Sequence, residues 1–174
     1  MNTAELETLI RTILSEKLAP TPPAPQQEQG IFCDVGSAID AAHQAFLRYQ
    51  QCPLKTRSAI ISGIRDELAP YLAELAEESA TETGMGNKED KFLKNKAALE
   101  NTPGIEDLTT SALTGDGGMV LFEYSPFGVI GSVAPSTNPT ETIINNSISM
   151  LAAGNTIYFS PHPGARSEEH TSEL

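Results

Sequence analysis

The first eighteen residues carry apolar side chains at helical spacing, with polar residues on the opposite face. This pattern predicts an amphipathic helix over residues 1–18, which Asn2 and Glu5 suit as a capping pair at its start. Its apolar face consists of Leu6, Leu9, Ile10, Ile13 and Leu14. Residues 19–30 are rich in proline and glutamine, which favours an extended linker that holds the helix away from the rest of the chain.

Helical spacing of apolar residues returns from about residue 36 and continues to about residue 99. One helix is expected near residues 36–47, with Ile39, Ala42, His43, Phe46 and Leu47 on its inner face. A third helix, counting the one over residues 1–18 as the first, begins after Pro53 and is expected to bend at Pro70, because a proline ring opposes the carbonyl group four residues earlier. It should end near Gly84. A fourth helix, over about residues 88–99, is more polar and is expected to be exposed.

After Pro103 the apolar pattern becomes that of strands. A turn at residues 115–118 precedes a strand-like run at 120–124, and Val129 to Val133 suggests a short buried strand. A helix is expected over residues 138–153 and a further strand over 156–159. Strand, helix and strand at this spacing form a βαβ unit, so the two strands should be parallel with a right-handed crossover.

Composition narrows the classes of function. The chain has 174 residues, of which 39% are hydrophobic, and a net charge of −12. Such an acidic balance argues against nucleic acid or an anionic membrane as a partner, and no apolar run is long enough to span a membrane. Tryptophan is absent, so an aliphatic core is expected. Two distant cysteines and three single histidines predict neither a disulfide framework nor a metal site.

Polar residues follow both strands of the expected βαβ unit. In an open α/β sheet, ligands bind outside the carboxyl ends of the strands, where residues 134–139 and 160–164 should lie. The first of these segments also opens a helix, whose free N–H groups favour an anion. Thr137 and Asn138 add side-chain donors, although plain helix capping would explain the same residue types. His162, considered alone, is a surface loop histidine.

Several motifs together resemble the aldehyde dehydrogenase superfamily. They are the run YSPFGVIGSVAP at residues 124–135, the segment STNPT at 136–140, LAAGNT at 151–156 and TGMG at 83–86. The segments PSTNP and SPHP resemble its CoA-acylating branch, which acts on short aldehydes such as propionaldehyde. The resemblance implies an α/β fold, namely a truncated Rossmann-like cofactor-binding domain, and oxidation of an aldehyde to an acyl-CoA with NAD and coenzyme A.

The same resemblance assigns roles to particular residues. Asn138 corresponds to the donor that stabilises the oxyanion, and Thr137 is the alternative donor if the motif is aligned one residue earlier. Ser160 stands where ordinary members have a lysine. The cofactor is expected to contact Val133, Ala134, Pro135, Ser136, Thr137, Ser160 and His162. The nucleophilic cysteine of the family lies further downstream, and neither Cys33 nor Cys52 matches its motif.

We therefore expect four parts. Residues 1–18 form an encapsulation-type helix that binds a microcompartment shell protein, 19–30 the linker, and 31–165 the first part of an NAD-binding domain. Residues 166–174 read as a non-native tail, translated from a sequencing adapter. The resemblance implies a location in the lumen of a cytoplasmic bacterial microcompartment and a homo-oligomeric full-length enzyme. The alternatives are a non-enzymatic shell-docking cargo or scaffold module, and an enzyme specific for acetaldehyde.

Overall fold

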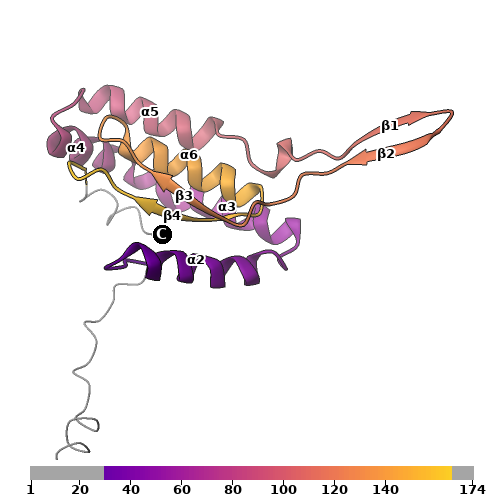
Figure 1. The fold of residues 1–174 in the computed structure, drawn as a ribbon. Helices are drawn as coiled ribbons and strands as arrows, with labels where there is room; N and C mark the ends of the chain where they lie inside the picture. Colours follow the sequence, from indigo (N-terminus) through magenta and orange to yellow (C-terminus); the bar gives the residue numbers. More distant parts are fainter. Residues whose placement is uncertain (1–29, 166–174) are drawn as a thin grey trace, which may run out of the picture. The chain divides into compact units, whose positions relative to one another are not determined.

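The computed structural model describes residues 30–165. The expected leading helix, with Leu6, Leu9, Ile10, Ile13 and Leu14, most of the linker and the tail lie outside the described residues. The chain divides into two units, Met1–Phe32 and Cys33–Leu174, and every element discussed here belongs to the second. Figure 1 shows this unit as two parallel strands with one helix on one side and the other helices on the opposite side.

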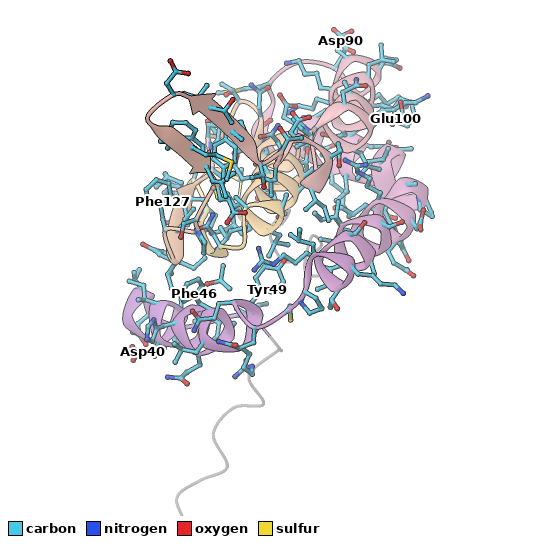
Figure 2. All side chains as sticks on the ribbon, turned by 90° about the vertical axis from the view of Figure 1, so that its right-hand side faces the viewer. Asp40, Phe46, Tyr49, Asp90, Glu100 and Phe127 are labelled. Carbon is cyan, nitrogen blue, oxygen red and sulfur yellow. The ribbon has the colours of Figure 1, made fainter. Side chains whose placement is uncertain are left out.

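Helix α2 spans Val35–Tyr49 and begins at Asp34, whose carboxylate accepts a hydrogen bond from the Ser37 N–H group. It packs against the two parallel strands through the side that carries Phe46 and Tyr49, while Asp40 lies on the opposite side (Figure 2). Only part of the expected inner face is covered. Ala42 is buried, whereas Ile39, His43 and Leu47 are exposed, because one side of the helix alone meets the strands.

The bend expected at Pro70 is confirmed. Helix α3, Leu54–Leu68, gives way to a 3₁₀ turn, η1, at Ala69–Tyr71, after which the chain resumes as helix α4 at Leu72–Thr83. Gly84 ends α4 in the left-handed conformation, with φ of 63°, which a glycine adopts without a steric penalty.

Helix α5, Lys88–Asn101, differs from the exposed helix that its polarity predicts. It packs between α4 and α6 (Pro139–Ala152), and this placement buries Lys91, Asn95 and Leu99. The hydrophobic core lies among α3, α4, α5 and α6. As expected for a chain without tryptophan, it is aliphatic. It consists of Ile61, Leu68, Leu72, Leu75, Leu99, Ile144, Ile148 and Ala152.

A β-hairpin follows α5 and a short 3₁₀ turn, η2, at Ile105–Asp107. Its strands β1, Ser111–Gly115, and β2, Gly118–Phe122, pair antiparallel and extend away from the helices (Figure 1). The turn and the second strand agree with the expectation, whereas the first strand was not expected. All ten residues of the two strands are exposed, so no alternation of buried and polar positions marks β1.

The βαβ unit is confirmed. Strands β3, Val129–Val133, and β4, Thr156–Ser160, pair in parallel, and α6 connects them. The expectation that residues 129–133 form a buried strand was wrong in its burial. Ser132 is its one buried residue and Val133 is 79% exposed, because Val133 lies at the end of the strand, where it pairs with Ser160 and neither helix covers it.

Candidate functional site

The parallel register brings the two polar loops of the βαβ unit to one edge. Val133 pairs with Ser160, and the N–H group of Ala134 donates to the Ser160 carbonyl at 3.1 Å. The segments after β3 and β4 therefore leave the sheet side by side, as the sequence predicts. The residues expected to contact the cofactor are the last residue of each strand and residues of the two segments that follow. They are Val133, Ala134, Pro135, Ser136, Thr137, Ser160 and His162.

Asn138 is the N-cap residue directly before α6, with φ of −143° and ψ of 61°. Its carbonyl group accepts hydrogen bonds from the N–H group and the hydroxyl of Thr142, while its side chain makes no capping bond to the helix. Plain capping therefore does not explain the Asn138 side chain. Instead, its Oδ1 accepts a hydrogen bond from Lys94 Nζ at 3.1 Å.

A buried lysine holds the residue before it. Lys91 is 4% exposed, and its Nζ donates to Ser79 Oγ at 2.5 Å and to the Thr137 carbonyl at 3.3 Å. Ser79 lies on α4, so this one side chain connects α4, α5 and the segment that precedes α6. Burying an ammonium group is costly unless hydrogen bonds replace its water. Lys91 therefore stabilises a specific position of the Thr137 backbone.

A second polar contact lies beneath the start of α6. Asn95 is 0% exposed, and its Oδ1 accepts a hydrogen bond from the Thr140 hydroxyl at 2.7 Å. Its Nδ2 is buried without a partner. Together with Lys91, this contact attaches the first turn of α6 to α5. Sequence reasoning missed both residues, although Lys91 and Asn95 are spaced by four along the face that ends in buried Leu99.

A depression of about 530 Å³ adjoins these residues. Thr137 and Asn138, the two candidate oxyanion donors, share its wall with Lys91 and Lys94. The remaining lining comes from the segment after α4 and the outer side of α5, at Met85, Gly86, Asn87, Asp90 and Leu93. The depression thus brings two cations, one carboxylate and two side-chain amides to one place.

Glu141, in the first turn of α6, lies near the same lysines. Burial raises the pKa of its carboxyl group above the ordinary 4.5, and the positive charges of Lys94 and Lys91 oppose that rise. A carboxylate at a helix N-terminus is favourable, so the burial cost is offset in part.

The end of β4 offers a half-buried Ser160 hydroxyl, and the segment after it offers the exposed imidazole of His162. Nδ1 of His162 accepts a hydrogen bond from the Gly164 N–H group at 3.1 Å, so this ring nitrogen is used within the loop. Within residues 30–165, no group of three or more His, Cys, Asp or Glu side chains is arranged to hold a metal ion. Cys33 is exposed and Cys52 half-buried, and both are free thiols.

Comparison with known proteins decides the family. Residues 26–167 match the model of the aldehyde dehydrogenase family. The chain belongs to the aldehyde dehydrogenase family. Its fold agrees with that of a propionaldehyde dehydrogenase from the Clostridium phytofermentans fucose utilisation bacterial microcompartment, with a TM-score of 0.78 and 47% identity over 82% of this chain and 33% of that one.

Two curated members of the aldehyde dehydrogenase family differ in their similarity to the chain. The CoA-propanoylating propanal dehydrogenase of Salmonella typhimurium is 83% identical over 95% of this chain and 36% of its own length. An acetylating acetaldehyde dehydrogenase of Escherichia coli is 42% identical over 95% of this chain and 35% of its own length. The chain thus spans about a third of the length of these relatives. None of the helices at residues 30–165 is long and apolar enough to cross a membrane.

Proposed function

We propose that the chain is the N-terminal portion of a CoA-acylating aldehyde dehydrogenase that converts propionaldehyde to propionyl-CoA with NAD and coenzyme A. The observation that carries this proposal is the 83% identity to the CoA-propanoylating enzyme of Salmonella typhimurium over 95% of the chain. An enzyme specific for acetaldehyde is the weaker alternative within the family, because the acetylating relative is only 42% identical.

Within this reaction, the edge formed by the ends of β3 and β4 supplies the polar contacts. Attack of a cysteine thiolate on the aldehyde places negative charge on the carbonyl oxygen, and an N–H donor held at that oxygen lowers the barrier. Asn138 fits the role of this donor, because its side-chain amide makes no capping hydrogen bond and lines the depression. Thr137 is the rival donor on the same wall.

The edge also suits a dinucleotide. Val133 offers an exposed apolar surface, and the half-buried Ser160 hydroxyl beside it can accept or donate a hydrogen bond to a ribose. Pro135, Ser136 and His162 extend the same surface on the two neighbouring segments. Bound NAD would supply the hydride acceptor, while these residues hold and orient it.

A chimeric enzyme tests the proposed activity. Residues 1–165 of this chain are joined to the part of the Salmonella relative that follows its matching segment, and the product is called here the joined enzyme. We expect NADH to form only when both propionaldehyde and coenzyme A are present, at a rate within about threefold of the parent. The 174-residue chain alone should form none, because neither of its two cysteines matches the nucleophile's motif.

An inactive but folded joined enzyme would refute the proposal. Turnover by the 174-residue chain that disappears on Cys52→Ala would refute the assignment of the nucleophile to a downstream residue.

The sequence of residues 1–18 supports binding to a protein partner that takes no part in the reaction. Residues 1–18 carry an apolar face on a helix-forming pattern, followed by the proline-rich linker, and such a tethered helix suits an apolar groove on another protein. One structural relative comes from a bacterial microcompartment. We therefore infer that residues 1–18 bind a microcompartment shell protein and place the enzyme in the lumen. A non-enzymatic docking module would share this helix but would not need the edge formed by β3 and β4.

The hairpin supports a homo-oligomeric full-length enzyme. Leu113, Met119, Val120, Leu121 and Phe122 are each more than half exposed on β1 and β2. Apolar side chains on both faces of a projecting hairpin are unfavourable in water and are typical of a surface that another subunit covers.

A further inference from the structure

Two lysines of α5 contact the two residues that compete for the role of oxyanion donor. Lys91 donates to the Thr137 carbonyl at 3.3 Å, and Lys94 donates to Asn138 Oδ1 at 3.1 Å. Because they are three residues apart, both lysines lie on one face of the helix. The ion pairs seen within residues 30–165, Arg65–Glu106 and Lys96–Glu100, involve neither of them. Both ammonium groups therefore donate hydrogen bonds to the segment at the start of α6.

The contact from Lys94 has a direction that chemistry imposes. An ammonium group carries three donors and no acceptor, so only the oxygen of the Asn138 amide can meet it. A rotated amide would bring its NH₂ group against the cation. In the part of the chain that the structure describes, the Asn138 side chain makes no other hydrogen bond. The NH₂ group is thus the end of the amide that remains available to a ligand.

The contact from Lys91 keeps the backbone in place behind this amide. It holds the Thr137 carbonyl from the buried side, and the peptide that links Thr137 to Asn138 is trans. In a trans peptide the C=O and N–H groups point in opposite directions, so fixing one fixes the other. The backbone from which the Asn138 side chain extends is therefore tied to α5 through Lys91, while Lys94 holds the side chain itself.

We propose that Lys94 is a positioning residue that turns the Asn138 amide so that its NH₂ group, rather than its oxygen, is presented to the oxyanion. This inference rests on the proposed function, since it assigns the donor role to Asn138 and not to Thr137. The positive charge at Oδ1 also draws electron density from the amide nitrogen, which strengthens its N–H groups as donors. An amide turned the other way would place an oxygen against the developing negative charge.

A charge series at Lys94 in the joined enzyme tests this inference. Lys94→Arg keeps a donor for Oδ1 and should retain kcat within about threefold. Lys94→Met releases the amide and should lower kcat by about tenfold. Lys94→Glu accepts from the NH₂ group and reverses the amide, so kcat should fall by about a hundredfold, the usual effect of losing one oxyanion donor. The KM for NAD should stay unchanged, as should kcat in the control Lys88→Met, an exposed lysine at the start of α5.

The same substitutions in the Asn138→Ala background distinguish an effect on the orientation of the Asn138 amide from a general effect on the structure. If Lys94 acts through Asn138, the three variants should there have equal kcat within about twofold. Equal losses of kcat in both backgrounds would overturn the inference and leave the proposed function intact. The same holds if the Lys94 variants of an active joined enzyme all have the same kcat. An inactive joined enzyme would overturn both. If Lys94→Glu fails to fold by its melting temperature, the comparison of Lys94→Arg with Lys94→Met in the two backgrounds decides.

Discussion

At the scale of single residues, the buried pair of Lys91 and Ser79 connects stability to the site. The Ser79 side chain is fully buried, and its hydroxyl accepts a hydrogen bond from an ammonium group that is itself 4% exposed. Removing one member of such a pair leaves the other without its partner, whereas replacing both with apolar groups removes the need for either. The pair therefore behaves as a unit.

The Ser79→Ala variant should lower the free energy of unfolding by about 1–3 kcal/mol, because the Lys91 ammonium then loses its shorter contact. The double variant Ser79→Ala with Lys91→Met should be destabilised by less than the two single changes added together. Denaturant unfolding of the joined enzyme measures both effects, with the exposed Ser58→Ala as the control. Strict additivity of the two single changes would contradict a coupled pair.

Glu141 predicts a pH dependence of stability. Burial raises the pKa of its carboxyl group in the folded chain above the ordinary 4.5. At pH values between the ordinary pKa and the raised one, the folded state therefore binds more protons than the unfolded state. Its contribution to stability is thus fully present below the ordinary pKa and is lost as the pH rises through the raised value. Glu141→Gln should remove this part of the pH dependence and stabilise the protein at neutral pH. Melting temperatures measured across that pH range check this prediction, with the exposed Glu77→Gln as the control. If Glu141→Gln shifts the melting temperature by the same amount at every pH, the effect is excluded.

The residues of the site divide into those that the sequence pattern finds and those that only packing reveals. The segments after β3 and β4 could be placed at one edge, since parallel strands bring their carboxyl ends together. Lys91, Lys94 and Asn95 could not be assigned to the site, because their contacts cross from α5 to α4 and to the start of α6. The spacing of Lys91, Asn95 and Leu99 by four residues puts them on one helix face, but two of the three are polar, so the pattern does not predict that this face is buried.

At the scale of elements, the hairpin β1–β2 gathers apolar side chains that are each more than half exposed. In an oligomer that covers it, Val120→Asp would place an unpaired carboxylate in the interface, which is strongly unfavourable. We expect this change to reduce the molecular mass of the joined enzyme in solution to that of a smaller assembly. Light scattering after size-exclusion chromatography measures it, and Asp116→Asn in the turn should leave the mass unchanged. An unaltered mass for Val120→Asp would argue against the hairpin as the interface.

The helix expected at residues 1–18 leads to a prediction about location in the cell. Burying five aliphatic side chains gives roughly 7–10 kcal/mol gross, most of which helix ordering and association consume. A fusion of residues 1–18 to a fluorescent protein should form foci in cells that make the shell. Ile10→Ala or Leu14→Ala should weaken these foci more than Arg11→Ala or Thr12→Ala. Diffuse fluorescence from the unchanged fusion, or equal losses from both faces, would count against encapsulation.

The elements themselves were predictable wherever local chemistry decides them. The bend at Pro70, the end of α4 at Gly84 and the βαβ unit follow from a proline, a glycine and a change of period. Strand β1 was not predictable, since a strand exposed on both faces needs no alternation of polar and apolar positions. The exposure of Val133 depends on its place at the strand end rather than on its type.

At the scale of the whole molecule, the described part of the chain combines an aliphatic core with an uncovered edge. The core lies among α3 to α6, while the ends of β3 and β4, the depression and the hairpin all face outward. The chain spans 36% of the length of its Salmonella relative, and the proposed nucleophile belongs to the remainder. The proposed reaction thus requires both portions, and in that proposal this one contributes the edge that would hold the cofactor and the oxyanion.

Removal of the Asn138 amide tests most directly whether this edge serves the reaction. In the joined enzyme, Asn138→Ala should lower kcat for propionaldehyde oxidation by about 10²–10³-fold, the usual effect of losing one oxyanion donor. The melting temperature and the affinity for NAD should remain close to those of the unchanged joined enzyme. A kcat within about threefold of the unchanged enzyme, with Thr137→Ala equally active, would contradict the assignment of the oxyanion site to the start of α6.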